Sequence, residues 1–401
     1  MAEYQASAAE IAEFIQGSSI LTDDVKEAID AILKDKGADG VATVEGTVTS
    51  ADVANQEAVL VSNDATLNNL TLGNDTTALV VGADTKGDVA METQEPATVQ
   101  IDEASVNLAI NNNADNNVTL SNAKGGSLSV GDGDNSINVA GGTNVSVETG
   151  DGDNNITMTD VTNASVKTGD GDDTISVKGA VSGNIQSGSG DLTLVMDQSA
   201  QEDAQISMDA GDGFDLLQLI GNAVKHTFEF VNGKFHMHSA DVAMTGVQVV
   251  AQDANSDGKI DLANDHITVL AENEKDSIVA KLYKVALGRE AIDGDDGWGG
   301  STLGGINWWM NEFEKQDSDQ SMDHLVKSFL NCDEFHNLYD KVDDATYVNA
   351  LLTNAGADTG LASKYLAELE SGASREDVAY QIASSVEVSG IDGQQYVVDG
   401  F

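Results

Sequence analysis

Glycine and aspartate alternate in short segments of this chain, and these two residue types in one turn suit the binding of a hard divalent cation. Ca²⁺ takes about six to eight oxygen ligands, and a turn supplies several backbone carbonyls only where glycine permits the backbone angles. Three copies follow one another at a spacing of 19 residues. They are Gly131-Asp132-Gly133-Asp134-Asn135, Gly150-Asp151-Gly152-Asp153-Asn154 and Gly169-Asp170-Gly171-Asp172-Asp173. We therefore expect calcium sites in these segments.

The repeat continues and predicts the architecture that carries these sites. A fourth copy begins at Gly188 after 19 residues, and a fifth, Gly211-Asp212-Gly213-Phe214-Asp215, follows 23 residues later, so its turn carries an insertion. Aliphatic residues keep the same spacing in the rows Val118, Ile137, Ile156, Ile175, Leu194 and Leu120, Val139, Met158, Val177, Met196. A fixed period is typical of a solenoid. The sequence predicts a parallel β-solenoid with 19-residue turns over residues 41–222, in which the turns of 41–117 have lost the glycine-aspartate pattern.

The segment 169–175, Gly-Asp-Gly-Asp-Asp-Thr-Ile, resembles the RTX nonapeptide G-G-x-G-x-D-x-U-x, a calcium-binding β-roll or β-helix repeat. The resemblance implies ligand positions at Asn135, Asn154, Asp173 and Asp215. It also implies a single row of ions on one edge, because the other half of each turn lacks the pattern. Asparagine offers only a neutral oxygen, Leu192 stands at the equivalent position of the fourth copy, and Thr168 replaces a motif glycine, so we expect weaker binding in places. The alternative is an array of Asp-Gly turns without metal, which the fixed register of the aspartates disfavours.

A second candidate calcium site lies after the solenoid. Residues 253–264 match the EF-hand loop at several ligand positions, with Gly258 at its sharp turn. The candidate ligands are Asp253, Asn255, Asp257, Lys259, Asp261 and Asn264. The last of these stands where an EF-hand has a bidentate glutamate, so the loop is closer to the dockerin type. The alternative is an acidic, solvated loop.

The large excess of acidic over basic residues limits which molecules the chain is expected to bind. The chain has 68 acidic and 19 basic residues in 401, a formal net charge of −49. Such a chain repels itself in the compact state unless cations neutralise it, although halophilic solubility is the other common reading. The only arginines are Arg289 and Arg375, so nucleic acid is not expected as a partner. Cys332 is the only cysteine, which excludes an intrachain disulfide.

The pattern changes along the chain and predicts a mixed, multidomain organisation. Residues 1–40 read as a small helical cap or docking element, in which the second helix opens at Thr22. After the solenoid we expect a β bridge over 223–272 with a hairpin turn at Asn232-Gly233, a helical domain over 273–390 and a tail over 391–401.

The helical region carries a second family resemblance. Residues 282–290, Leu-Tyr-Lys-Val-Ala-Leu-Gly-Arg-Glu, with Asp293 and the Trp308-Trp309 pair, resemble domain-of-unknown-function family 4214, which is often appended to RTX proteins. Residues 347–351, 358–361 and 371–375 fit a second half of its pattern, so the resemblance covers about 275–388. It departs at an inserted segment, 298–304, and in lacking a second Leu-Gly-Arg box. The resemblance implies a surface-associated or secreted protein and no particular reaction.

Export is expected to follow a one-step route. The first twenty residues have no basic and apolar regions of a cleavable signal, and no apolar run is long enough to span a membrane. The tail Tyr396–Phe401 is similar to uncleaved type I secretion signals. We therefore expect the type I secretion apparatus as a partner, with calcium triggering folding after exit because a ligand of the native state stabilises it.

Catalytic motifs are not found, and an enzyme is not expected. His236 and His238 share one face of a predicted strand and could bind a metal, but a packed or solvated pair is the simpler interpretation. The sequence instead favours a calcium-dependent protein that assembles with copies of itself at the cell surface, as an S-layer, sheath or extracellular filament. The alternative is an RTX adhesin or biofilm-matrix protein that binds a glycan, such as cell-surface polysaccharide, or another cell.

Overall fold

The computed structural model divides the chain into two compact units, residues 1–213 with 236–245, and residues 214–235 with 246–401. It describes all residues except 1–6, 19–20, 51–52, 54–55, 198, 222–227, 238–240, 254–265, 271–273, 290–308, 310–321, 387, 389–390, 393–394 and 400–401.

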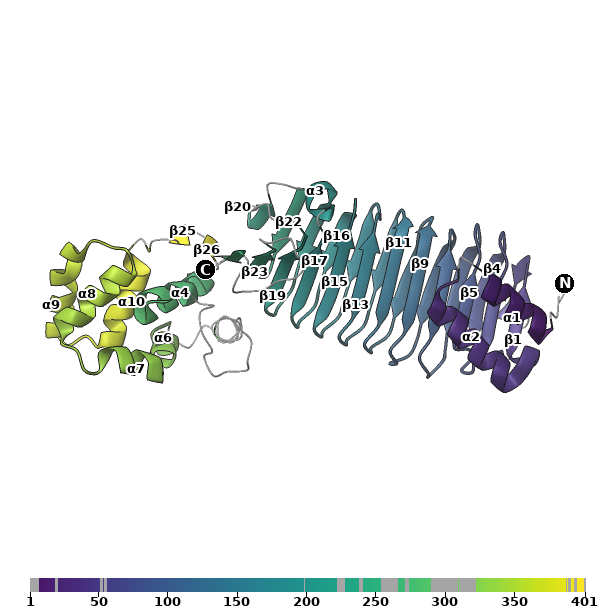
Figure 1. The fold of residues 1–401 in the computed structure, drawn as a ribbon, viewed down its shortest axis with the longest axis horizontal. Coiled ribbons are helices and arrows are strands. Elements are labelled where there is room, and N and C mark those ends of the chain that lie inside the picture. Colours follow the sequence, from purple (N-terminus) through teal and green to yellow (C-terminus); the bar gives the residue numbers. More distant parts are fainter. Residues whose placement is uncertain are drawn as a thin grey trace. The chain divides into compact units, whose positions relative to one another are not determined.

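The first unit is a parallel β-solenoid of about nine turns, built from two sheets whose strands alternate along the chain (Figure 1). The first sheet contains β1 (Val41–Val44), β3 (Ala58–Val61), β5 (Ala78–Val81), β7 (Thr98–Asp102), β9 (Asn117–Ala123), β11 (Ser136–Gly142), β13 (Asn155–Thr159), β15 (Asp173–Lys178) and β17 (Leu192–Met196). The second contains β2 (Thr47–Val48), β4 (Thr66–Leu72), β6 (Lys86–Met91), β8 (Ser105–Ile110), β10 (Gly126–Val130), β12 (Val145–Glu148), β14 (Ala164–Lys167), β16 (Ser182–Gln186), β18 (Gln205–Asp209) and β22 (Asp241–Thr245). The predicted fold class is confirmed.

The strand register follows the predicted 19-residue period. Ile137 pairs with Val118 on one side and with Ile156 on the other, and Ile175 pairs with Leu194. The members of this row are at most 1% exposed, because successive turns stack their aliphatic side chains into one continuous core. The register also extends into the faded turns, where Val41 pairs with Ala58 and Ala58 with Ala78, so the first turns are 17 and 20 residues long.

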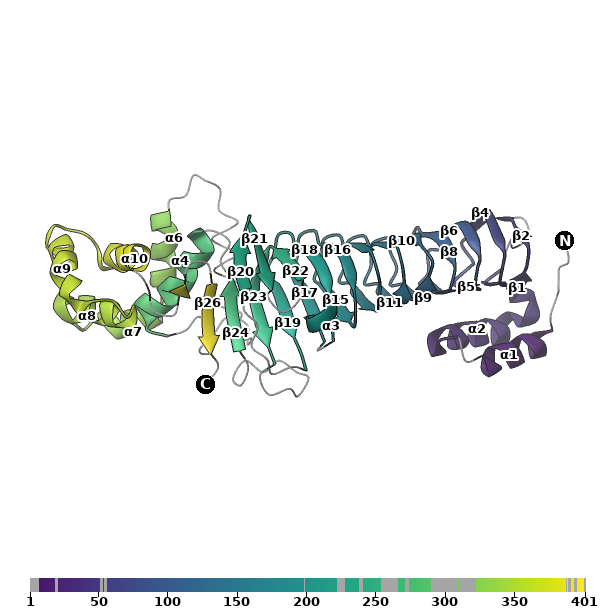
Figure 2. The ribbon, with the colours of Figure 1, turned by 90° about the horizontal axis from the view of Figure 1, so that it is seen from above.

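Two helices cover the outer face of the first sheet over its first turns (Figure 2). They are α1 (Ala8–Gly17) and α2 (Asp23–Lys36), followed by the 3₁₀ turn η1 (Gly37–Gly40). Val25, Ile29 and Ile32 of α2 belong to a buried cluster that also contains Ala58 and Leu60 of β3. The predicted helical element therefore packs on a face of the solenoid.

The predicted insertion before the fifth repeat is a short helix. It is α3 (Ala200–Asp203), which lies between β17 and β18. Beyond residue 222, where the sequence placed the end of the solenoid, β22 pairs in parallel with β18 and continues the second sheet.

The second unit begins with strands. In it, β19 (Asp215–Leu219) pairs in parallel with β23 (Val247–Gln252), and β24 (His266–Leu270) is antiparallel to β23. The predicted secretion tail contains β25 (Ile391–Asp392) and β26 (Gln395–Asp399), and β26 pairs with β24. At the predicted hairpin, Asn232 and Gly233 lie between β20 (Phe228–Val231) and β21 (Lys234–Met237) and both have positive φ, as a type I′ turn requires.

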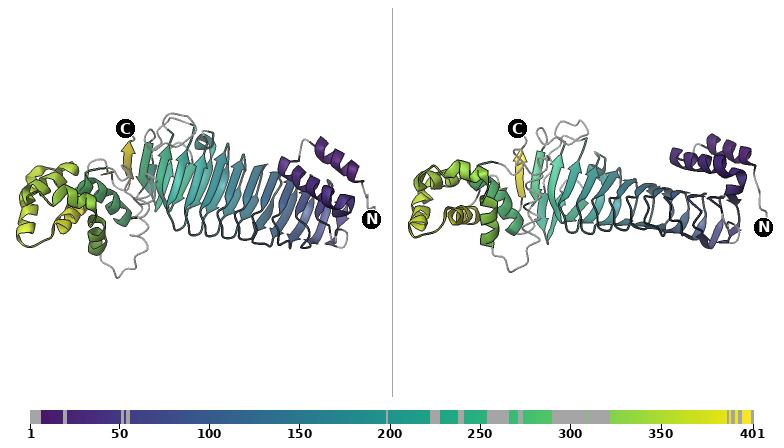
Figure 3. Two further views of the ribbon diagram at one scale, coloured as in Figure 1. Left: turned by 60° about the horizontal axis from the view of Figure 1, so that its bottom comes forward. Right: turned by 90° about the horizontal axis from the view of Figure 1, so that it is seen from below.

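The rest of the second unit is helical (Figure 3). It comprises α4 (Glu274–Leu282), the π-helix η3 (Tyr283–Leu287), α6 (Met322–Leu330), α7 (Asp333–Tyr339), α8 (Asp344–Asn354), η4 (Thr359–Leu361), α9 (Ala362–Glu370) and α10 (Arg375–Ser385). These helices share one core, which includes Phe329, Phe335 and Tyr347. Among the residues that the structure describes, no helix is long and apolar enough to cross a membrane.

The two arginines of the chain both hold this helical domain together. Arg289 donates from Nε and Nη2 to the two carboxylate oxygens of Glu334 at 2.8 and 3.0 Å, and its guanidinium lies 4.9 Å from the ring centroid of Tyr283. Arg375 donates from Nε and Nη2 to the Oδ1 atom of Asp344 at 3.0 and 2.7 Å, and its guanidinium lies 5.0 Å from the ring centroid of Tyr347. A planar fork suits both interactions, so these arginines serve packing within the domain.

Candidate metal site

The glycine-aspartate segments all lie on one edge of the solenoid, between a strand of the second sheet and the next strand of the first. They form a stack of equivalent turns, 112–116, 131–135, 150–154, 169–173 and 188–192, which we call the acidic edge. Turn 131–135, for example, joins β10 to β11. The parallel register places each residue of one turn beside its counterpart 19 positions later.

Aspartates form two columns along this edge. One column contains Asp115, Asp134, Asp153, Asp172 and Asp191, and the other contains Asp132, Asp151 and Asp170. In both columns the Oδ1 atom of one aspartate accepts a hydrogen bond from the backbone N–H one turn later, at 2.8–3.1 Å. Ser189 makes this bond to Asp170 and lowers the pKa of that carboxyl.

The charges of these columns are not balanced by the described lysines and arginines. In the part of the chain that the structure describes, no basic side chain forms an ion pair with Asp132, Asp134, Asp151, Asp153 or Asp172, which are exposed. Stacked strands are about 4.8 Å apart, so neighbouring carboxylates in a column repel one another. A cation bound at the edge would relieve this repulsion.

The glycines of the acidic edge are required by the stacking itself. Gly152 and Gly171 have φ values of 122° and 126°, which residues with a side chain rarely adopt. A Cβ atom on either would lie 2.5 Å from the carbonyl oxygen of the glycine one turn earlier. These positions therefore call for glycine whether or not a metal is bound.

The residues at the predicted ligand positions point into the solenoid and form a ladder of hydrogen bonds. Asn116, Asn135, Asn154 and Asp173 are each 1% exposed. The Nδ2 atom of each asparagine donates to the Oδ1 atom of the next member at 2.8–3.0 Å, and its backbone N–H donates to the same oxygen at 3.0–3.2 Å. We call these four residues the interior ladder.

The amide groups also reach the carbonyls of their own turns. Asn135 Nδ2 donates to the carbonyl oxygens of Gly131 and Gly133 at 3.2 and 2.8 Å. Asn154 Nδ2 donates to Gly150 and Gly152 at 3.5 and 2.8 Å. The backbone donor on the Oδ1 side fixes the orientation of each amide, so the nitrogen and not the oxygen faces the glycine carbonyls.

Asp173 ends the ladder and differs from the other members. Its Oδ1 atom accepts from the backbone N–H and the Nδ2 atom of Asn154, both at 3.0 Å, but its buried Oδ2 atom has no hydrogen-bond partner among the described residues. Burial raises the pKa of this carboxyl, against the opposing effect of the Thr168 hydroxyl and the Asn154 donors. The next turn carries Leu192 at the same position, which is buried and offers no polar group.

The donor sets of the turns differ in how well they fit Ca²⁺. Turn 169–173 combines a buried carboxylate oxygen without a partner and two glycines, Gly169 and Gly171, in the register of Gly150 and Gly152. A hard cation with oxygen ligands fits this set. Turns 131–135 and 150–154 present an amide nitrogen to the same carbonyls. Within the described residues no cluster of three or more His, Cys, Asp or Glu side chains forms a metal site on its own, so backbone carbonyls would have to complete the coordination.

The remaining predicted ligands lie elsewhere or are only partly described. Asp212 of the fifth copy forms a parallel bridge with Ser189, and its backbone N–H donates to Gly188. In the second unit, Asp215 is buried and its backbone N–H donates to Gln248 Oε1 at 2.6 Å. Asp253, the first residue of the EF-hand-like segment, is buried and accepts a hydrogen bond from the backbone N–H of Gly221. The other candidate ligands of this loop, Asn255, Asp257, Lys259, Asp261 and Asn264, lie outside the described residues, as do Asp293, Trp308 and His238.

Three polar residues that the sequence reasoning did not select belong to the acidic edge. Asn112 and Asn116 are joined through their amides, Asn116 begins the interior ladder, and Asp115 begins one of the aspartate columns. All three stand 19 residues before a selected or equivalent position. The 19-residue period predicts these positions. Segment 112–116 has no glycine, however, so it does not show the glycine-aspartate pattern by which the other turns were recognised.

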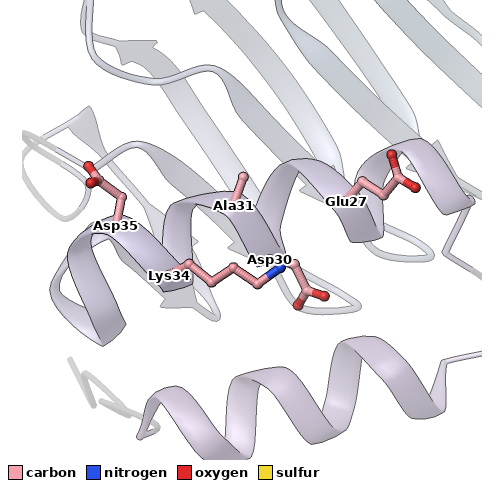
Figure 4. A pocket seen from close by; sticks show the side chains of 5 residues that line it. All are labelled: Glu27, Asp30, Ala31, Lys34 and Asp35. Carbon is pink, nitrogen blue, oxygen red and sulfur yellow. The ribbon is translucent and has the colours of Figure 1, made fainter.

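One further hollow lies on the exposed side of α2 and has the character of a solvated surface. It is lined by Glu27, Asp30, Ala31, Lys34 and Asp35; in Figure 4 the Lys34 side chain extends toward Asp30, and Glu27 and Asp35 lie at opposite ends of the helix. Asp30 is bonded to Gln16 of α1. This arrangement offers no convergent ligand set.

Comparison with known proteins identifies only the helical region. No curated protein and no solved structure matches the chain. The resemblance predicted for 275–388 is supported from residue 326 onward, over the helices from α6 to α10. Residues 326–390 match the family model described as domain of unknown function (DUF4214).

Proposed function

We propose that this chain is a secreted structural protein of the cell surface, in which calcium bound along the acidic edge stabilises the solenoid and promotes assembly with further copies. The observation that carries the proposal is Asp173. A buried carboxylate oxygen without a hydrogen-bond partner costs stability unless it takes up a proton or a cation. The glycine carbonyls expected beside it are the ligands that Ca²⁺ prefers.

The aspartate columns support calcium as the cation. They place a carboxylate about every 4.8 Å along the edge, on a chain whose formal charge is −49. Divalent cations between neighbouring turns would reduce this repulsion and hold the turns in register. Export as an unfolded chain through a type I apparatus then suits the protein, because calcium is scarce inside cells and abundant outside.

A structural role suits the architecture better than catalysis does. The described part of the solenoid is a stack of turns with one continuous aliphatic core, and its acidic edge repeats one arrangement along its length. Repeated surfaces of this kind favour ordered contacts between copies. A layer, sheath or filament subunit is the form of the proposal that we favour over an adhesin.

The test is a titration of the purified full chain with CaCl₂ after removal of metal by chelation. Calorimetry should detect saturable binding, and thermal unfolding should shift upward with calcium. At a free calcium concentration of about 100 times Kd, one site adds about 2.7 kcal/mol. MgCl₂ at the same ionic strength is the control, and an equal shift with magnesium would indicate charge screening alone.

Assembly is tested on the same samples by electron microscopy. Ordered sheets or fibres should form when calcium is added and dissolve when the chelator returns. A chain that binds calcium and remains monomeric throughout would contradict self-assembly and leave the adhesin as the alternative.

A further inference from the structure

In each turn of the acidic edge, backbone carbonyl oxygens face the interior ladder residue and need a partner. The ladder residue is an asparagine in some turns and an aspartate in one, so the partner cannot be the same in all of them. Every turn must satisfy the carbonyl oxygens that face its ladder residue, since buried acceptors without partners are costly. In turns 131–135 and 150–154 the amide N–H₂ group does so, with distances of 2.8 Å to Gly133 and Gly152. In turn 169–173 the ladder residue is a carboxylate, which as an anion has no hydrogen to donate.

The amide nitrogen of each ladder asparagine lies at the position that a cation would need in order to bind the same oxygen atoms. Asn154 Nδ2 faces two carbonyls of its own turn and the Oδ1 atom of Asp173, which together make a convergent set of oxygen atoms. The two N–H bonds of a primary amide can serve such a set without any metal. Asn116 does the same in turn 112–116, where Nδ2 donates to the carbonyl of Ala114 at 2.7 Å.

We propose that the asparagines of the interior ladder replace calcium, so that the turns up to residue 159 close without metal and the interior requirement for a cation is confined to Asp173. This inference rests on the proposed calcium function and limits where it acts. Asn135 and Asn154, which the RTX resemblance marks as weak ligands, are then structural substitutes for the ion.

The consequence is a solenoid with a metal-independent part and a metal-dependent part. In the turns from 112 to 159 the ladder amides serve the carbonyls that face them, although the buried Thr149 hydroxyl has no hydrogen-bond partner among the described residues. These turns are paired in parallel register with the next turn. Turn 169–173 receives the donors of Asn154 on one side and meets Leu192 on the other, and its Gly169 carbonyl accepts the backbone N–H of Gly188 at 3.2 Å. The buried Oδ2 atom of Asp173 is left without a hydrogen bond, and in this proposal a cation serves it while the carboxylate is charged. Calcium would order β15 and the strands after it on a preformed template.

The experiment is hydrogen exchange of the full chain, read by mass spectrometry in peptides that separate the turns, in chelator and in CaCl₂. Peptides within 117–159 should be equally protected in both. Peptides within 169–196 should gain protection, by about tenfold at a calcium concentration about ten times Kd. If the turns from 117 to 196 all gain protection together, the inference fails and the calcium function stands. If no calcium binds and no turn responds, both fail.

The variant Asp173→Asn provides a second test of the inference. An amide at this position would close turn 169–173 as Asn154 closes its own, so the calcium response of 169–196 should disappear and protection in chelator should rise to the level that the parent chain reaches in calcium. Asp203→Asn, an exposed position on α3, is the matched control and should keep the response. A calcium response that persists in Asp173→Asn overturns the assignment to Asp173.

Discussion

Turns 150–154 and 169–173 have nearly the same backbone and differ at one interior atom. Asn154 and Asp173 occupy equivalent ladder positions 19 residues apart and are equally buried. The asparagine donates to two carbonyls of its turn and to the next ladder residue, whereas one oxygen of the aspartate has no partner. The Gly-Asp-Gly-Asp pattern therefore describes the geometry of the turn, and we propose that the interior residue after it decides whether the turn takes a cation.

The largest expected effect comes from giving turn 150–154 the interior carboxylate of turn 169–173. Asn154→Asp would place a carboxylate against the carbonyl of Gly152 and beside the carboxylate of Asp173. In chelator we expect a loss of roughly 3–5 kcal/mol in the free energy of unfolding, because buried charges without partners are this costly. Calcium should restore a large part of it. The measurement is chemical denaturation with and without calcium.

The matched control for this variant is Asn138→Asp, which adds the same charge at an exposed position of β11. It should change stability little and leave the calcium dependence unaltered. If Asn154→Asp were as stable as the parent chain in chelator, the amide would not be closing the turn.

Substitution of a turn glycine tests whether that glycine is needed for the backbone conformation of the turn or for binding calcium. Gly152→Ala would force a Cβ to within 2.5 Å of the Gly133 carbonyl oxygen at a φ of 122°, and we expect a cost of roughly 1–3 kcal/mol or more. The cost should be equal in chelator and in calcium, since the clash is between backbones. Gly46→Ala, at a φ of 72° with open space around the Cβ, tests the backbone strain without the clash and should cost less. A loss for Gly152→Ala that calcium abolished would point to a ligand role instead.

The smallest effect is expected at the surface columns. Asp153→Asn keeps an oxygen that can accept the backbone N–H of Asp172 and removes one charge from the column. Without calcium we expect a change of only about 0.5 kcal/mol, the usual size for an exposed substitution, because reduced repulsion offsets a weaker hydrogen bond. Denaturation at low and high salt measures it. A large loss confined to calcium-containing buffer would make Asp153 a strong ligand and shift the emphasis from the interior to the columns.

The sequence by itself determined the periodic part of this protein. A 19-residue period in Ile137, Ile156 and Ile175 can be buried only by stacking equal turns, so the solenoid and its acidic edge follow from the spacing. The two N-terminal helices and the C-terminal helical domain follow from their caps and their apolar spacing for the same local reason.

Only the tertiary structure decided which atoms of the edge face which partners. The sequence shows Asn135 beside Asp134 with no sign that one points inward and the other outward, because that depends on the register of the neighbouring turns. It also could not show that Asn116 continues the interior ladder, that β22 adds a strand after residue 222, or that α2 packs over β3. Hydrogen bonds between residues 19 apart exist only once the turns are stacked, and they distinguish a turn closed by an amide from turn 169–173, where the Oδ2 atom of Asp173 has no such bond.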